Sequence, residues 1–136
     1  MVELLVPADA EVEVVAELNA SMPDDFALMR AGTKIPDPRP DEFIRVVATG
    51  GAERDLVTDD PILVVEAFST SETRAQRGCA FAIAVLQAGA RMGRVGAATC
   101  HSVRVLGLPA NLPMPTVPDH FRFTATISAS LRRAAG

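Results

Sequence analysis

The segment from Phe121 to Leu131 alternates strictly between apolar and polar side chains, and this constrains the fold more than any other feature of the sequence. Its odd-numbered positions hold Phe, Phe, Ala, Ile, Ala and Leu, whereas its even-numbered positions hold Arg, Thr, Thr, Ser and Ser. Successive side chains of a β-strand point to opposite faces of its sheet. The pattern therefore predicts a long strand with one face in a hydrophobic core and the other in solvent.

Shorter apolar and β-branched runs predict the other strands, at residues 26–35, 43–48, 62–68 and 102–106. The second and third of these form a hairpin whose connection, residues 49–60, is too long for a two-residue turn. We interpret this connection as a charged contact arm. It carries Glu53, Arg54, Asp55, Asp59 and Asp60.

The first helix is expected to begin after Asp9, a residue type that caps helix N-termini, and to end before Pro23. Apolar side chains recur within it at helical spacing. These predicted core positions are Val12, Val15, Leu18 and Met22.

The second helix is expected to start at a capping box formed by Ser69 and Glu72. An apolar stripe follows from Ala75 to Ala90, and Phe81 and Val85 fall outside that stripe. Two interpretations remain open for this pair. Either the two side chains are buried only in an oligomer, or they cover the shoulder of the helix within one subunit.

Glycines at 93 and 96 indicate the end of this helix, and the prolines of residues 109–118 indicate a stiff loop before the last strand. The order of elements is then α-β-β-β-α-β-β. We expect one α+β domain over residues 1–136, in which a mixed, largely antiparallel sheet of about five strands packs against two helices. A chain of 136 residues with 49% hydrophobic residues is long enough for such a core.

Charge and hydropathy argue against two classes of partner. A net charge of -4 provides no basic field for binding nucleic acid by its phosphates. The longest apolar run, residues 78–86, is far shorter than the roughly 18 residues that span a bilayer, so we expect no membrane segment. The two cysteines accompany no secretory leader, which favours a reducing cytoplasm.

The candidate catalytic residues form only weak patterns. Cys100 and His101 are adjacent on a predicted strand, so their side chains point apart and cannot act as a nucleophile and its base. Cys79, Cys100, His101 and His120 lack the paired spacing of a zinc site. We therefore expect no enzyme activity, cofactor or metal. A small ligand-binding domain or enzyme that uses Cys100, His101 and His120 in a pocket beneath the helices is kept as an alternative.

Residues 35–68 carry a resemblance to a known family. A proline-punctuated lead-in, a short strand, a Gly-Gly turn and a second strand follow one another, and the elements on either side keep the same order. Characteristic phrases are Pro38-Arg39-Pro40, Val57-Thr58-Asp59 and Pro109-Ala110-Asn111-Leu112-Pro113. Over nearly its whole length, the chain resembles the small tail terminator proteins of long, non-contractile-tailed bacteriophages, especially those that infect actinobacteria.

The resemblance implies a virion protein, assembled in the host cytoplasm, that forms a hexameric ring on the completed tail tube, ends tube polymerisation and presents a surface to the head-side connector protein. Viral DNA would pass through the lumen without sequence-specific binding. On this interpretation the arm with Arg54, Asp55, Asp59 and Asp60 contacts the tail tube protein or a neighbouring subunit. Arg39 and Arg45 would pair with carboxylates across the ring. A head-side completion or connector protein of the neck is the alternative within the same class.

Overall fold

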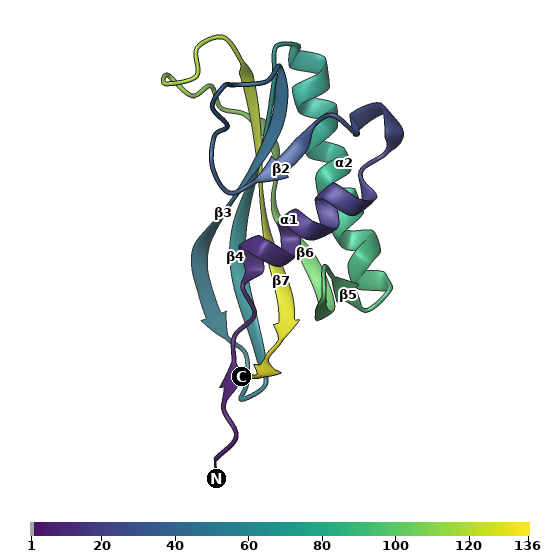
Figure 1. The fold of residues 1–136 in the computed structure, drawn as a ribbon, viewed down its shortest axis with the longest axis vertical. Coiled ribbons are helices and arrows are strands. Elements are labelled where there is room, and N and C mark those ends of the chain that lie inside the picture. Colours follow the sequence, from purple (N-terminus) through teal and green to yellow (C-terminus); the bar gives the residue numbers. More distant parts are fainter. Residues whose placement is uncertain (1) are drawn as a thin grey trace.

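The computed structural model describes residues 2–136 and shows an α+β fold (Figure 1). Two helices lie on one side of a long, curled sheet, as the sequence predicts. The elements are β1 (Leu5–Val6), α1 (Ala10–Ser21), a 3-10 turn η1 (Asp24–Phe26), β2 (Arg30–Gly32), β3 (Glu42–Glu53), β4 (Thr58–Ser69), α2 (Glu72–Arg91), β5 (Arg94–Val95), β6 (Ala98–Asn111), β7 (Phe121–Arg132) and β8 (Ala134–Ala135).

The main sheet has the strand order β2-β3-β4-β7-β6-β5. Only β2 and β3 run parallel, and every other neighbouring pair is antiparallel, so the sheet is mixed and largely antiparallel. Its four long strands each contain 12 or 14 residues. Strands β1 and β8 form a separate antiparallel ladder of two residue pairs.

The core lies between the helices and one face of the sheet. The odd-numbered side chains of β7 from Phe123 to Leu131 are buried there, which confirms the predicted core face over this stretch. Phe121 is exposed and Ser130 is buried, contrary to the prediction for these two positions. Leu18 from α1 and Leu86 from α2 pack against this face. A smaller cluster lies on the opposite face, where the rings of Phe43 and Phe68 stack at 4.5 Å between centroids.

The β3–β4 hairpin is longer than the sequence indicated. Strand β3 continues to Glu53 and β4 begins at Thr58, so the expected charged arm of residues 49–60 shrinks to a connection of residues 54–57. The Gly-Gly pair forms no turn, because Thr49 is bulged out of the ladder and pairing resumes at Gly50. Both glycines have positive φ angles, which let the strand continue past the bulge.

Strand β6 also exceeds its predicted length. It runs through Gly107 and Pro109 to Asn111, whereas the sequence indicated a strand ending at Leu106 and a loop from Pro109. Proline is tolerated here because β6 pairs on one side only along this stretch, so a missing amide breaks no ladder on the other side. The register shifts around Gly107 mark the same irregularity.

Two predicted helix details are wrong. Ser71 caps α2, and its hydroxyl accepts from the Arg74 amide, because Ser69 is still the last residue of β4. In α1 the predicted cap is confirmed, because the Asp9 carboxylate accepts a hydrogen bond from the Val12 amide at 3.2 Å. Val12 itself is exposed, however, and Val14 is buried in its place.

The predicted strand at residues 26–35 is mostly wrong as well. Phe26 ends the 3-10 turn η1, and only Arg30–Gly32 form a strand, β2. The buried side chains of Phe26 and Met29 are three residues apart and both point into the core. This spacing fits a turn and excludes a regular strand over the whole segment.

Candidate interaction surfaces

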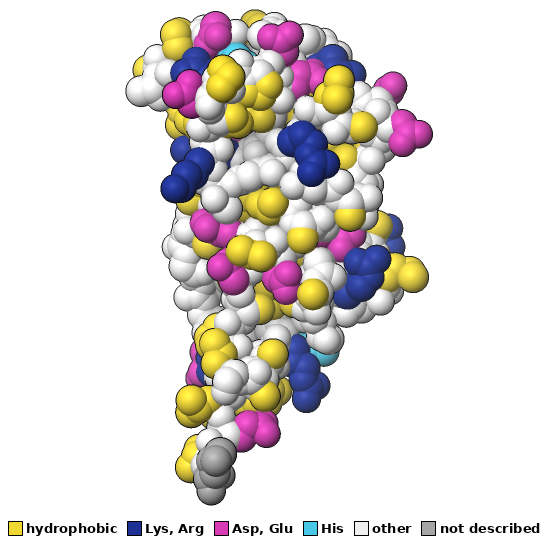
Figure 2. Space-filling model, viewed as in Figure 1, with side chains coloured by type: hydrophobic (Ala, Val, Ile, Leu, Met, Phe, Trp, Pro, Cys, Tyr) yellow, Lys and Arg dark blue, Asp and Glu magenta, His cyan; other side chains and the backbone are white. Residues whose placement is uncertain are grey.

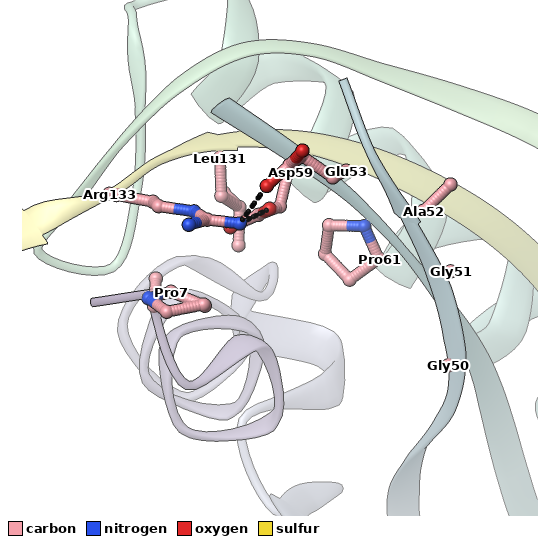
Figure 3. Close-up of a pocket in the computed structure, with 10 residues that line it drawn as sticks. Pro7, Gly50, Gly51, Ala52, Glu53, Asp59, Pro61, Leu131 and Arg133 are labelled. Atoms are coloured by element: carbon pink, nitrogen blue, oxygen red, sulfur yellow. Dashed lines mark hydrogen bonds and ion pairs between the residues drawn. The ribbon is translucent and has the colours of Figure 1, made fainter. Parts of the chain in front are cut away.

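The tapered end of the molecule brings together three segments that are distant in sequence. Residues Pro7 and Ala8, the glycine-containing part of β3, and the end of β7 surround a cavity of about 300 Å³ (Figure 3). Asp59 and Pro61 of β4 complete its lining. We call this region the hairpin end, because it lies beside the tip of the β3–β4 hairpin.

Arg133 holds the hairpin end together. Its guanidinium makes a two-pronged contact with Asp59, from Nε to Oδ2 at 2.9 Å and from Nη2 to Oδ1 at 2.7 Å. Nη2 also donates to Glu53 at 2.9 Å, as the dashed lines of Figure 3 partly show. Chiefly through the Asp59 contact, these carboxylates raise the pKa of Arg133 above its ordinary value. The pair fixes the hairpin against the end of β7.

The other charged residues of the predicted arm also have partners within the chain. Arg54 lies 3.3 Å from the carboxylate of Asp60, which in turn accepts from the Ser130 hydroxyl. Asp55 accepts from the Val57 amide at 2.9 Å, and this contact lowers the pKa of the Asp55 carboxyl. Arg54 is about half exposed and keeps free donors for a further partner.

Arg39 and Arg45, expected to pair across a ring, have carboxylates available within the same chain. Arg39 Nη1 lies 2.9 Å from Asp119. The Glu66 carboxylate is buried between Arg45 and Arg122, with contacts of 2.5 and 2.6 Å on the sheet face opposite the helices. A pairing of either arginine across subunits therefore requires exchange or sharing of an existing partner.

Phe81 and Val85 are half-buried and pack against the core of their own subunit. The Phe81 ring lies 5.4 Å from that of Phe26, and the Arg77 guanidinium sits over it at 4.9 Å. The structure thus places this pair at the shoulder of α2. This placement agrees with the second of the two interpretations.

Sequence reasoning missed two exposed apolar surfaces. The first lies on β6, where Leu106 and Leu108 are 48% and 75% exposed. The second is at the tapered end, where hydrophobic side chains gather beside the N-terminal segment (Figure 2). Its exposed members are Val2, Leu4, Val6 and, at the hairpin tip, Leu56. For the first surface a signal existed, since Leu106 and Leu108 are two residues apart and share one face of a strand.

The sheet has two open margins on opposite sides. Strand β2 covers β3 only at residues 43–45, and strand β5 covers β6 only at residues 98–99. Beyond these short pairings, no strand within residues 2–136 pairs with the outer side of β3 or β6. On β3 the Ala48 amide donates a hydrogen bond to the Glu11 carboxylate at 2.7 Å. Exposed strand margins of this length are sites for contact with other chains.

The candidate catalytic residues lie apart. Cys100 is buried and His101 is exposed, which confirms that neighbouring strand side chains point to opposite faces. Buried His120 has Nε2 at 2.8 Å from the Pro40 carbonyl, and its Nδ1 lies 3.2 Å from Asp119 without an aligned hydrogen bond. His120 and Arg39 lower the Asp119 pKa. Among residues 2–136, no group of three or more His, Cys, Asp or Glu side chains is placed to hold a metal.

Two concave regions bear on the ligand-binding alternative. A cavity of about 540 Å³ lies over the start of α2, between Leu28, Pro40 and the Glu42–Arg74 pair. Cys100, His101 and His120 do not line this cavity, whereas His101 lines a smaller one of about 260 Å³ between the end of α2 and β6. Within residues 2–136, no helix is both long and apolar enough to cross a membrane.

No protein-family model matches the sequence, and no curated protein matches it. The likeness to tail terminators therefore stays a prediction from the residues quoted above. The structure adds an α+β fold with two open sheet margins and two exposed apolar surfaces.

Proposed function

We propose that the protein is a virion structural protein that forms a ring on the end of a completed phage tail tube. The ring stops further polymerisation of the tube and provides the surface to which the head-side connector joins. The resemblance to tail terminators supports this role and implies six subunits, with DNA passing through the lumen. The overall negative charge of the subunit suits a channel that does not retain DNA.

The observation that carries this proposal is the position of the two open sheet margins. A closed ring needs a heterologous contact, in which two different surfaces on opposite sides of the subunit meet. Strands β3 and β6 lie toward opposite sides of one rigid sheet, and each leaves most of its outer side unpaired within residues 2–136. One subunit can therefore contact a neighbour on each side.

The apolar side chains on β6 support the same assignment. Leu106 and Leu108 lie on the open part of that strand and are exposed in the single subunit. Burial of aliphatic side chains contributes about 25 cal/mol for each Å² removed from water. A subunit contact on this margin would therefore gain stability from side chains that are otherwise hydrated.

Light scattering over a concentration series tests the proposal, with purified tail tubes of a long-tailed phage present or absent, followed by negative-stain imaging. Rings alone, or rings only on tube ends, are the expected result, and the second case would show that the tube supplies part of the interface energy. A protein that stays monomeric and does not bind tubes over the whole concentration series would overturn the proposal. Binding to a purified head connector without binding to tubes would instead favour the neck-protein alternative.

A further inference from the structure

The N-terminal segment is held to the rest of the subunit by a very small ladder. Leu5 pairs with Ala135 and Val6 with Ala134, and the Gly136 amide donates to the Leu4 carbonyl at 2.9 Å. The segment extends past the end of the main sheet, where β1 lies beside the C-terminal residues (Figure 1). We call residues 2–6 the N-terminal arm.

This arm is apolar but hardly buried. The exposed fractions of Val2, Leu4 and Val6 are 82%, 64% and 47%. An isolated two-stranded ladder is marginal in water, and three or more strands or a packed apolar face are needed for independent stability. The contacts within one subunit are therefore too few to hold the arm firmly in place.

The connector between the arm and α1 borders two cavities, while its Ala8 side chain packs against the core. Pro7 and Ala8 line both the cavity of about 300 Å³ at the hairpin end and a second one of about 430 Å³ on the side of β8. Because open space lies on two sides of this connector, the chain can turn in a new direction at exposed Pro7 while Ala8 keeps its contact with the core. The helix that follows is fixed separately by its Asp9 cap and by the buried side chains of Val14 and Leu18.

The arm has one surface in this chain to which it is already complementary, and that surface is β8. The fit includes the last glycine, since a Cβ atom at position 136 would lie 2.5 Å from a Val6 methyl group. A second copy of the chain presents the same surface. Exchange of an identical element between subunits keeps every contact of the ladder and costs only the rearrangement of the connector.

We propose that in the assembled protein β1 leaves its own subunit and pairs with β8 of the neighbouring copy. The inference rests on the proposed ring, in which each subunit gives its arm to the next in one direction. Val6 and Leu5 lie two and three residues before Ala8 and so reach about 10 Å from it, which means that the neighbour's β8 must lie within this distance of Ala8. The exchange would also bring the exposed aliphatic side chains of the arm against a second subunit.

Paired cysteines distinguish the two arrangements. The bond from Gly136 to Leu4 makes Leu5 and Ala135 a non-hydrogen-bonded pair, whose Cα atoms lie about 4.5 Å apart in antiparallel ladders, within the range that a disulfide accepts. The variant Leu5→Cys/Ala135→Cys is allowed to assemble, oxidised, denatured and run on a non-reducing gel. The native Cys79 and Cys100 are both buried. A Leu5→Ser/Ala135→Ser variant serves as the control without a bond.

A ladder of covalent multimers up to the ring is the expected result. Monomers alone would overturn the exchange, and so would a ladder that stops at the dimer, since a reciprocal dimer does not propagate around a ring. Light scattering of the same sample reports on the ring independently. An assembled ring whose disulfides are all within single chains would leave the proposed function standing and overturn only the exchange.

Mixing and locking experiments give a second readout. Equal amounts of Leu5→Cys and Ala135→Cys subunits, mixed and oxidised, should form a mixed disulfide dimer, which no arrangement confined to one chain can produce. Double-cysteine subunits oxidised at high dilution close their own arms, and we expect loss of ring formation until a reductant is added. Normal assembly of the locked, oxidised subunits would contradict the proposal.

Discussion

The two cysteines show how burial alone sets the chemistry of a residue. Desolvation raises the pKa of the Cys79 thiol to about 12, and burial also raises that of Cys100. A thiol is nucleophilic as its thiolate, so neither residue is prepared to attack a substrate at neutral pH. Burial of Cys100 beside an exposed His101 also agrees with the expectation from the sequence that these two side chains point apart.

We predict that the native protein resists Ellman's reagent at pH 8 and that two thiols per chain react once denaturant is added. The physical reason is the low thiolate population and the lack of access. A Thr99→Cys variant, with its thiol at an exposed position of β6, should react at once and serves as the control. Rapid labelling of a native cysteine would favour the enzyme alternative.

Glu42 is the carboxylate whose ionisation should matter most for stability. Arg74 contacts both its oxygens, at 2.6 and 2.9 Å, and Ser69 donates to it at 3.0 Å. The Arg74 contact in particular holds the pKa of Glu42 below its ordinary value of 4.5, against an opposing effect of burial. The stabilisation is therefore complete above pH 4.5 and is lost as pH falls through the lower pKa of the folded state.

Replacement of Glu42 by Gln should reduce the free energy of unfolding by about 1 to 2 kcal/mol at pH 7, since Arg74 is partly exposed and water screens the pair. The stability of the variant should also fall less steeply below pH 4.5. Urea unfolding at several pH values measures both effects. Glu72→Gln, at an exposed position of α2, is the matched control. An unchanged acid slope in E42Q would contradict the assignment.

The sequence predicts that arginines pair with carboxylates but not which carboxylates they choose. Lys34 is the only lysine, so the chain relies on guanidinium groups that favour two-pronged contacts. The observed partners are distant in sequence, as Arg39 and Asp119 or Arg133 and Asp59 illustrate. Such pairs depend on sheet register and strand order, which local patterns do not determine.

At the scale of elements, the bulge in β3 depends on two glycines with different surroundings. Both have positive φ angles, 109° for Gly50 and 128° for Gly51. A Cβ atom at position 50 would meet open space, whereas one at position 51 would collide with the backbone of Asp60 and Pro61. Gly50 is therefore required only for its backbone angle, and Gly51 is required for both angle and space.

We predict that Gly50→Ala lowers the free energy of unfolding by about 1 to 3 kcal/mol, from backbone strain alone. Gly51→Ala should cost clearly more, because the hairpin ladder must also separate. Urea unfolding of the two variants side by side measures the difference. Equal losses would mean that the hairpin end relaxes freely and that the close approach at Gly51 has no energetic weight.

Continuous local patterns predicted the helices and strands well, whereas patterns interrupted by glycine or proline did not. The alternation in β7 and the Asp9 cap of α1 were both predicted, because each is encoded within a few neighbouring residues. The extensions of β3 past Gly50 and of β6 past Pro109 were missed. Glycine and proline normally end strands, and only the pairing with β4 and β7 shows that these strands continue.

For the whole molecule, the exposed leucines of β6 are the sharpest test of ring formation. Leu108→Asn should abolish assembly in light scattering, because it places a polar group in the proposed contact. The unfolding free energy of the monomer should change by no more than about 0.5 kcal/mol, since the side chain is 75% exposed. Leu28→Asn, at another highly exposed leucine, should leave assembly intact. Normal rings of L108N would exclude this margin from the interface.

Charge reversal at the hairpin end tests contact with the tube. Arg54→Glu brings a third acidic group beside Asp55 and Asp60 and should block attachment to tail tubes without unfolding the subunit. Arg54→Gln removes the charge without reversing it and should have a smaller effect. Sedimentation of tubes with bound protein measures both. Unchanged binding of R54E would rule out Arg54 as a contact.

The candidate surfaces were harder to predict than the fold. Phe81 and Val85 were chosen as candidate interface residues because they lie off the helical stripe, yet in the structure they pack against the core of their own subunit. Leu106 and Leu108 were not chosen, although they are exposed. Exposure depends on which elements cover each face of the sheet, and this is a property of the whole topology.

The meeting of the two chain ends at the tapered end has a practical consequence. Because Leu4 and Gly136 are joined by a hydrogen bond, the first described residues and the C-terminal residue lie at the same end of the molecule. For the same reason a linker of a few residues can join the ends into a circular chain, with new ends opened in the exposed tip at residues 54–57. Such a permuted protein would keep its core, but its N-terminal arm would be tied to β8 of the same chain and could not pair with a neighbouring subunit.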